Sequence, residues 1–309
     1  MGGRGTGLTA TGGLPLVDAH VHLWSRRDDG MTWLDELDPR VPRVSTVHTL
    51  ESAVVDVELE AIVAVESAPG ECATRRLLER AADSPWPVAV VGSVDLNAPD
   101  ASDVLDRLRA VGGELLRGIR LTASSRDDWT SSTSRAVGAA RLDDRGLVVE
   151  ILTSRRLLDA VWAFADRSPQ VMVVIDHLGG VADGSGDDRD WRAGMARLAA
   201  LPNTVVKLSG WRTPEPAGID RAFRHLVAEF GVARVVVGSD WPMCASVGTY
   251  AETMTATAHL LSWLPLDQRR RMFSANAHAL YRPRSTGRTS HRPMVGRTTD
   301  PRAPFQERP

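Results

Sequence analysis

The sequence predicts a single-domain α/β protein, a (β/α)8 TIM barrel followed by a disordered C-terminal tail. Three observations lead to this prediction. Eight short apolar runs recur along the 309 residues, segments with helical spacing separate most of them, and polar side chains cluster where the runs end. A barrel of this class has about 250 residues and carries its active site at the carboxyl ends of the strands.

Each apolar run is rich in Val, Ile or Leu, which is typical of parallel strands buried on both faces. The runs span residues 16–23, 61–67, 88–96, 115–122, 147–153, 171–179, 204–211 and 235–242. A doubly wound sheet is the alternative architecture, and it usually has a glycine-rich phosphate loop after its first strand. The stretch HVHLWSRRDDG, residues 20–30, carries no such loop, so the pattern favours the barrel.

The segments between the runs supply the expected helices. One apolar stripe at helical spacing predicts helices within 74–82, 102–111, 154–166 and 191–201, and two more, 249–262 and 266–281, follow the last strand. The link at 124–145 is rich in Ser and Asp and predicts a weak helix at best. We therefore divide the chain into a flexible leader (1–15), the barrel (16–282) and an Arg-, Pro- and Thr-rich tail (283–309).

The composition is that of an ordinary globular protein. A net charge of −2 gives no field that would attract nucleic acid or an anionic membrane. No apolar segment approaches the roughly 18 residues of a membrane span. Cys72 and Cys244 are too few for a disulfide framework. We expect a cytoplasmic protein that acts on a small molecule, and the sequence leaves the oligomeric state open.

The first apolar run contains two histidines. In a regular strand, Asp18, His20 and His22 share one face, and buried imidazoles need polar partners. At the end of a first barrel strand, both rings would point into the barrel mouth, where a divalent metal can bridge them. Two core histidines with partners inside the protein explain the pattern equally well.

Two further residues with catalytic chemistry end later runs. His177 ends the sixth run and precedes Gly179, and Asp240 ends the eighth run ahead of Pro242. Taken singly, His177 could be structural and Asp240 could cap the next segment. At one barrel mouth with the first-strand histidines, however, the set suits hydrolysis in which Asp240 takes a proton from water.

Charged residues near other strand ends are candidate substrate contacts. Arg120 ends the fourth run and could hold a carboxylate or a polarised oxygen, or form an outward salt bridge. Glu66 and Glu150 end the second and fifth runs and could be ligands, hydroxyl acceptors or partners of Arg120. Lys207 is the only lysine and lies within a buried run, which favours an internal ion pair over a direct substrate contact.

Tryptophans flank several strand ends and the first long loop: Trp24, Trp33, Trp211 and Trp241. Aromatic walls at a barrel mouth suit a ring-shaped substrate, although tryptophans also plug barrel ends. We expect Trp24 or Trp241 to lie nearest the pocket.

Several motifs together resemble one protein family. HVHLW, WLDEL, VDL, RGIR, DHLGG, PNTVVKLSGW, GSDWPMC and NAHALY occur in this order between about Leu16 and Tyr281. The set closely resembles the amidohydrolase-related (amidohydrolase 2) family, in particular its lactonase branch, which includes L-fuconolactonase, L-rhamnonolactonase and 2-pyrone-4,6-dicarboxylate lactonase. The HxH motif alone is a weak signal, whereas the ordered set ending in KLSG and GSDWP is specific to this group.

The resemblance implies a (β/α)8 barrel that opens lactone rings. It implies that His20, His22, His177 and Asp240 form the catalytic cluster, with Asp240 activating water, and that Arg120 contacts the substrate. We expect one weakly held divalent metal, zinc above all, on His20, His22 and Asp240. His177 is a further candidate ligand.

The implied metal site departs from that of the wider superfamily. There a histidine on strand 5 helps to hold the metal, whereas Glu150 stands on that strand here. Some members of the lactonase branch work without a metal and use the histidines to polarise the carbonyl, so metal-free catalysis stays open. A metal-dependent decarboxylase of the same superfamily is the alternative enzyme. A barrel recruited for binding alone would tolerate loss of Asp240 or His177.

Four positions depart from the usual lactonase pattern. Glu66 stands where Gln is common, Ser93 replaces a Trp and Leu121 replaces a His, while DHLGG lacks the Lys-Pro that often follows DHLG. All of them lie near the expected pocket, so they leave the substrate undetermined. They keep the acid–base cluster intact.

Overall fold

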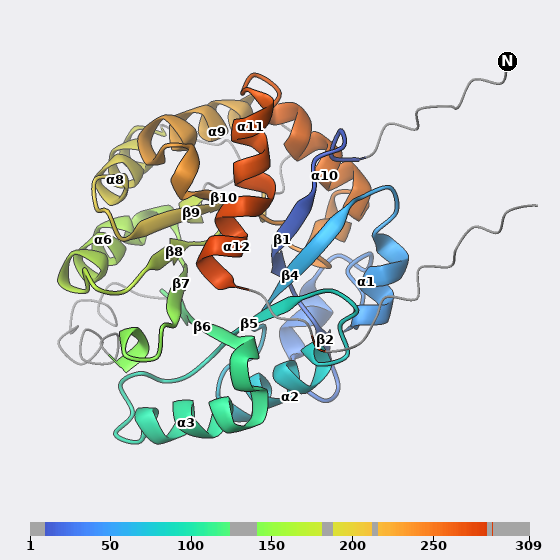
Figure 1. The fold of residues 1–309 in the computed structure, drawn as a ribbon, viewed down its shortest axis with the longest axis vertical. Coiled ribbons are helices and arrows are strands. Elements are labelled where there is room, and N and C mark those ends of the chain that lie inside the picture. Colours follow the sequence, from blue (N-terminus) through green and yellow to red (C-terminus); the bar gives the residue numbers. More distant parts are fainter. Residues whose placement is uncertain (1–9, 124–140, 181–187, 212–215, 283–285, 287–309) are drawn as a thin grey trace, which may run out of the picture.

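The computed structural model describes residues 10–123, 141–180, 188–211, 216–282 and 286. Within these residues, eight parallel strands form one sheet whose order follows the chain (Figure 1). The strands are β1 (Leu16–Val21), β4 (Leu59–Val65), β5 (Val88–Gly92), β6 (Leu116–Thr122), β7 (Val148–Leu152), β8 (Val173–Ile175), β9 (Thr204–Leu208) and β10 (Val235–Val237). All eight predicted strands are present. A small antiparallel sheet pairs β2 (Trp24–Ser25) with β3 (Val44–Ser45).

The first and last strands meet at their carboxyl ends and nearly close the barrel. Val21 forms an isolated parallel bridge with Trp241. The amide of His22 donates to the Trp241 carbonyl at 2.6 Å, and the amide of Asp240 donates to the His20 carbonyl at 3.0 Å. The predicted (β/α)8 class is confirmed, and the closure brings the ends of β1 and β10 side by side.

Most helices cover the outside of the barrel (Figure 1). The α-helices are α1 (Val47–Ala53), α2 (Glu71–Ala81), α3 (Ala101–Gly112), α6 (Leu158–Arg167), α8 (Arg189–Ala199), α9 (Pro216–Phe230), α10 (Tyr250–Leu260), α11 (Leu266–Arg270) and α12 (Asn276–Tyr281). The segment α7 (His177–Gly180) is a single turn whose four residues have left-handed φ. Short 3₁₀ turns lie at Thr32–Glu36, Gly113–Leu115, Arg155–Leu157, Val232–Arg234 and Met243–Ser246, and a π-helical turn, Arg271–Ala275, joins α11 to α12. The six predicted helical segments are all found, whereas α1 and α9 were not predicted. Most of the 124–145 link lies outside the described residues.

Side chains along the strands alternate between two apolar layers, because successive residues point to opposite faces. On β4, Ile62 and Ala64 pack with the surrounding helices, whereas Ala61, Val63 and Val65 pack inside the barrel. The interior is therefore filled by side chains and is no open channel.

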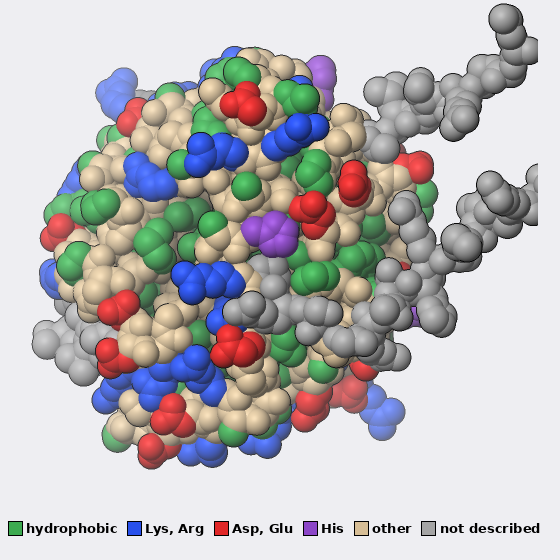
Figure 2. All heavy atoms as spheres, in the orientation of Figure 1, with side chains coloured by type: hydrophobic (Ala, Val, Ile, Leu, Met, Phe, Trp, Pro, Cys, Tyr) green, Lys and Arg blue, Asp and Glu red, His purple; other side chains and the backbone are tan. Residues whose placement is uncertain are grey.

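The helix α12 closes the amino-terminal end of the barrel. Its Ala277 and Tyr281 pack in the inner layer with Val17 and Val148, which lie near the starts of β1 and β7. Figure 1 shows α12 over the middle of the barrel, and Figure 2 shows basic and acidic side chains interspersed on the same face. The carboxyl ends of the strands, at the opposite end, are left for a site.

The predicted leader and tail are only partly described. Thr11 and Leu14 are fully buried, and the amide of Ala10 donates to the Asp56 carbonyl, so residues 10–15 of the predicted leader pack against the barrel. Residues 1–9 and most of 283–309 lie outside the described residues, where the predictions of a flexible leader and a disordered tail stay predictions. No helix in the described part of the chain is long and apolar enough to span a membrane.

Candidate active site

The HxH motif lies at an irregular end of β1. The pairing of β1 with β4 shifts register between Asp18 and Val21, so the regular alternation of faces is interrupted there. His20 and His22 point to the inside, but Asp18 does not share their face as predicted. That prediction was wrong because the local register shift cannot be read from a strand pattern.

Asp18 instead ties β1 to the end of the barrel and to α10. Its Oδ1 accepts hydrogen bonds from the amides of His20 at 3.1 Å and Ser239 at 2.8 Å. Its Oδ2 accepts a hydrogen bond from the hydroxyl of Tyr250 on α10 at 2.9 Å. Burial raises the pKa of Asp18, and these hydrogen bonds oppose that effect. Asp18 therefore holds the two ends of the sheet together behind the histidines.

His177 and Asp240 both occupy left-handed backbone positions, with φ of 51° and 60°. This conformation is strained for residues other than glycine, and it turns each side chain sharply at its strand end. Two glycines make room for the rings. An added Cβ would lie 2.3 Å from His177 Nδ1 at Gly210 and 2.7 Å from His20 Cβ at Gly238. The glycines of the KLSG and GSDWP motifs thus permit close packing of the site histidines.

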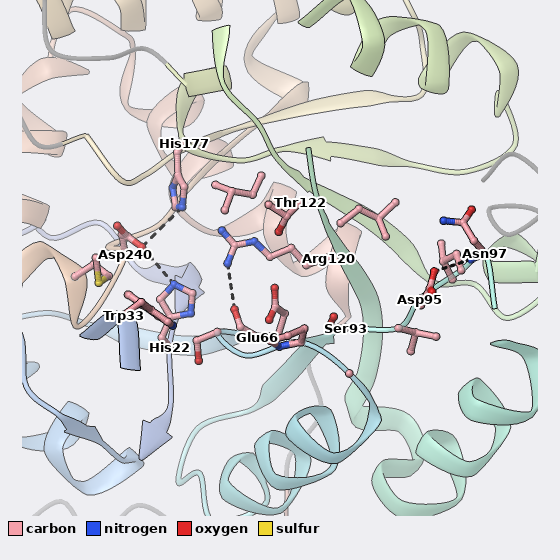
Figure 3. Close-up of a pocket in the computed structure, with 18 residues that line it drawn as sticks. His22, Trp33, Glu66, Ser93, Asp95, Asn97, Arg120, Thr122, His177 and Asp240 are labelled. Carbon is pink, nitrogen blue, oxygen red and sulfur yellow. Dashed lines mark hydrogen bonds and ion pairs between the residues drawn. The ribbon is translucent and has the colours of Figure 1, made fainter. Parts of the chain in front are cut away.

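Three imidazoles converge on one carboxylate oxygen, Asp240 Oδ1. The Nε2 atom of His22 lies 3.5 Å from it, that of His20 3.8 Å, and that of His177 3.9 Å. Figure 3 shows His22, His177 and Asp240 facing one another across a small space. The structure thus brings together the four residues that the sequence placed at one barrel mouth. Their catalytic roles stay predictions.

A buried cation lies beneath the histidines. The Lys207 ammonium contacts Glu150 Oε1 at 2.8 Å, Asp176 Oδ1 at 3.1 Å and His20 Nδ1 at 3.1 Å, and the four side chains are fully buried. Three N–H donors thus meet three acceptors, so Lys207 forms the internal ion pair that its position in the sequence favours. Tyr281 donates a hydrogen bond to the same oxygen of Glu150.

These contacts fix the proton positions on the HxH pair. Because an ammonium only donates, His20 Nδ1 accepts from Lys207, and the neutral ring carries its hydrogen on Nε2. His22 Nδ1 lies 2.9 Å from the Val65 carbonyl and must donate to it, which leaves a lone pair on His22 Nε2. The two Nε2 atoms lie 3.3 Å apart, and the His20 N–H donates to His22. Burial and the Lys207 charge keep His20 neutral by lowering its pKa.

Asp176 is a site residue that the sequence analysis missed, although it precedes His177 in the DHLGG motif. Its Oδ2 faces the Nε of Arg120 at 3.1 Å, and its Oδ1 faces Lys207. Burial opposes its ionisation, but the two cations outweigh burial and lower the pKa of Asp176 to about 2. Burial raises the pKa of Glu150 to about 7 despite Lys207. Asp176 therefore carries the negative charge that balances Arg120.

A cavity of about 810 Å³ opens above this layer. Among the predicted site residues, those that line it are His22, Glu66, Arg120, His177 and Asp240. The predicted residues that do not line it are His20, Trp24, Glu150, Lys207 and Trp241, which lie behind or beneath the wall. Polar groups that the sequence analysis did not assign to the site also line the cavity, among them Ser67, Asp95, Asn97 and Thr122.

The tryptophan nearest the cavity is Trp33, and not Trp24 or Trp241 as predicted. Trp24 is fully buried, stacks on His22 at a centroid distance of 5.5 Å, and donates its indole N–H to a backbone carbonyl. Trp241 packs edge-on against Tyr250. Trp24 therefore supports a site histidine from behind and does not face the cavity.

The donor set at the cavity floor fits a zinc ion. One nitrogen each from His20 and His177 and one oxygen from Asp240 lie within 4.8 Å of one another, and these are ligand types that zinc prefers. In the tautomer in which His177 Nδ1 donates to the Ser209 hydroxyl, at 2.9 Å, the Nε2 lone pair is available to a metal. For His20 to bind a metal through Nε2, its hydrogen would have to move to Nδ1, and the contact of Nδ1 with Lys207 would have to open.

A family model described as Amidohydrolase matches residues 17–282. This chain belongs to the amidohydrolase family. The match covers the whole described barrel, so the predicted family of enzymes is confirmed.

Curated relatives of the chain include two named enzymes. An L-fucono-1,5-lactonase from Burkholderia ambifaria is 31% identical over 282 residues, which cover 86% of this chain and 95% of the relative. An L-fucono-1,5-lactonase from Burkholderia multivorans is 32% identical over 254 residues, which cover 76% of this chain and 85% of the relative.

Solved structures show the same fold. An amidohydrolase from Burkholderia multivorans with bound zinc is 29% identical, with a TM-score of 0.77 over 87% of this chain and 99% of that one. A 2,6-dihydroxybenzoate decarboxylase from Rhizobium is 14% identical, with a TM-score of 0.54 over 87% of this chain and 99% of that one, and this likeness concerns the fold alone.

Proposed function

We propose that this chain is a lactonase, a hydrolase that opens a lactone or a related cyclic ester. The two L-fucono-1,5-lactonases, 31% and 32% identical, support this reaction class. The observation that carries the proposal is the position of Asp240 Oδ1, which lies 3.5–3.9 Å from three imidazole Nε2 atoms at the cavity floor. A carboxylate beside the neutral rings of His20 and His177 can take a proton from water.

Asp240 acts as the general base in this mechanism. A water molecule beside it gives a proton to the carboxylate as its oxygen attacks the lactone carbonyl. His177 stabilises the carbonyl oxygen as negative charge develops, because the Ser209 hydroxyl can donate to Nδ1 and leave a hydrogen on Nε2. Burial keeps His177 neutral by lowering its pKa to about 4, against the opposing effect of Asp240.

The remaining residues hold this pair and the substrate in place. His20 donates to His22, whose ring is fixed by the Val65 carbonyl. Arg120 lines the cavity, and we assign it to a polar substituent of the substrate. A zinc ion, when bound at the His20, His177 and Asp240 group, supplies Lewis-acid polarisation of the carbonyl.

A lactone panel tests the proposal. Aldonolactones and aromatic-pathway lactones are assayed by acid release, with and without a chelator. Wild-type protein is expected to hydrolyse at least one of them, and Asp240→Asn is expected to lower kcat by about 100- to 10,000-fold, the usual contribution of a general base. The same substitution at the exposed Asp267 on α11 is the control and should leave kcat unchanged. Wild-type rates in Asp240→Asn would refute the role.

No observation favours the decarboxylase alternative specifically. The similarity to the Rhizobium decarboxylase, at 14% identity, shows only that both chains share the barrel fold. We therefore do not propose decarboxylation.

A further inference from the structure

Two carboxyl groups flank the HxH strand. The strand β1 meets β10 on one side and pairs with β4 on the other; Asp240 follows β10, and Glu66 follows β4. Both side chains line the cavity. Figure 3 shows His22 between Asp240 and Glu66. Glu66 in turn lies between His22 and Ser93. A lactone whose carbonyl lies at Asp240 would therefore extend its ring past Glu66.

The backbone of Glu66 is fixed by hydrogen bonds, whereas its carboxyl group makes none with the described residues. The amide of Glu66 donates to the Val91 carbonyl at 2.8 Å, and its carbonyl accepts from Arg120 Nη1 at 3.1 Å. The Nε of Arg120 faces Asp176 at 3.1 Å. Within the described part of the chain, no hydrogen bond or ion pair reaches the Glu66 carboxyl group. Asp176 thus balances Arg120, and the Glu66 carboxyl group faces the cavity without an ion pair to any described residue.

The surroundings of Glu66 favour its protonated form near neutral pH. Burial raises the pKa of Glu66 to about 7. Arg120 on β6 lowers this pKa, whereas Asp176 after β8 and Glu150 on β7 raise it. A carboxyl group in this state holds a proton that it can donate to a reacting atom.

We propose that Glu66 is the general acid that protonates the leaving ring oxygen, a role that rests on the lactonase function proposed above. As the tetrahedral intermediate collapses, the bond between the carbonyl carbon and the ring oxygen breaks, and its electron pair stays on that oxygen. Glu66 gives its proton to the oxygen, while Asp240 holds the proton taken from water. Asp240 then releases its proton and Glu66 takes one from solvent, so lactone and water give one hydroxy acid.

The leaving group provides the sharpest test. L-fucono-1,5-lactone expels an alkoxide, whose conjugate acid has a pKa near that of water, about 16. Dihydrocoumarin expels a phenolate, whose conjugate acid has a pKa of about 10, like the tyrosine side chain. The phenolate leaves without a proton, and the alkoxide does not leave readily. A general acid therefore matters for the first substrate and little for the second.

Glu66→Gln keeps the size and hydrogen bonding of the side chain and removes only its acid function. We expect kcat to fall by about 100-fold or more on L-fucono-1,5-lactone and by less than about 5-fold on dihydrocoumarin, with KM little changed. Asp95→Asn is the matched control, because Asp95 lines the same cavity and its carboxylate already accepts a hydrogen bond from the backbone N–H of Asn97. It should change both rates by the same factor. Equal loss on both substrates in Glu66→Gln overturns the proposal.

The pH profile gives a second readout. Wild-type kcat/KM on L-fucono-1,5-lactone should fall above about pH 7 as Glu66 ionises, and Glu66→Gln should lack this alkaline limb. An alkaline limb that persists in Glu66→Gln overturns the proposal, even where wild-type protein does not accept dihydrocoumarin. A wild-type protein inactive on every lactone overturns the lactonase function itself, and the Glu66 role with it. If the protein hydrolyses lactones but Glu66→Gln shows neither the leaving-group effect nor the pH effect, only the proposed role of Glu66 is overturned.

Discussion

Removing the Lys207 ammonium should destabilise the barrel above neutral pH. Lys207 lies between Glu150 and Asp176, and all three side chains are fully buried. In Lys207→Met, Asp176 keeps Arg120 as a partner, but among the described residues Glu150 keeps only the hydroxyl of Tyr281. Breaking a buried ion pair by removing one partner costs about 3–5 kcal/mol where the remaining group stays charged, and less where that group can take up a proton.

The loss of stability in Lys207→Met should depend on pH, and the direction of this dependence follows from the ionisation of Glu150. Burial already raises the pKa of Glu150 to about 7, and Lys207 opposes this effect, so Lys207→Met raises that pKa further. Below that pKa the carboxyl group is protonated and the penalty is small. The loss of stability therefore grows as the pH rises through about 7. At pH 8, one unit above this pKa, the carboxyl group escapes ionisation by keeping a proton at a cost of about 1.4 kcal/mol. The melting temperature at pH 8 should therefore fall by about 3 °C, since about 2 °C corresponds to 1 kcal/mol in a protein of this size.

This effect is measured by thermal and urea unfolding at pH 6 and pH 8. The proteins compared are wild type, Lys207→Met and the double variant that carries Lys207→Met and Glu150→Leu. The double variant removes both members of the pair and leaves Asp176 with Arg120, so it should regain most of the lost stability. The reasoning is refuted by a Lys207→Met protein that melts like wild type at pH 8. A double variant no more stable than the single variant refutes it as well.

Three further predictions concern the packing around His177, the hydrogen bond from Tyr250 to Asp18, and the pH dependence of stability. Gly210→Ala places a Cβ 2.3 Å from His177 Nδ1 at a φ of 66°, so it should displace the ring and lower kcat at least about 10-fold; unchanged kinetics would contradict this. Tyr250→Phe leaves Asp18 Oδ2 without its hydroxyl donor and should cost about 1–3 kcal/mol in urea unfolding, and a loss below about 0.5 kcal/mol would count against the Asp18 link. The pKa of Glu66, raised to about 7 from 4.5, means that stability falls as pH rises between these values. Glu66→Gln should remove up to about 3 kcal/mol of this fall, as measured by unfolding at pH 5 and pH 8; identical pH dependence in both proteins would disprove it.

The sequence by itself determined the barrel and its active end. Parallel strands buried on both faces require apolar runs, and eight such runs can be counted directly. His177 and Asp240 were found because each lies at the end of such a run. The strand ends of a barrel meet at one mouth whatever the loops contain, so residues far apart in the chain could be predicted to converge. The helices α1 and α9 were missed, although Ile219, Phe223, Leu226 and Phe230 form a buried apolar stripe at helical spacing along α9.

Only the tertiary structure decided which side chains face the cavity. The register shift after Asp18 turns that carboxylate toward α10. Trp33 lines the cavity through a loop whose path no local pattern fixes, and Trp24 lies behind His22. The sequence allowed Glu150 either a substrate role or an ion-pair role. Its distance from Lys207, a residue on another strand, assigns it to the layer beneath the cavity.

The physical reason for this division is the range of the interactions. Burial and alternation act over a few neighbouring residues, so they can be recognised in the sequence. Hydrogen-bond partners, proton positions and counter-ions depend on groups that only the closed barrel brings within about 3 Å. The Lys207–His20 contact, across 187 positions of sequence, is such a case, and it sets which nitrogen of His20 carries the proton.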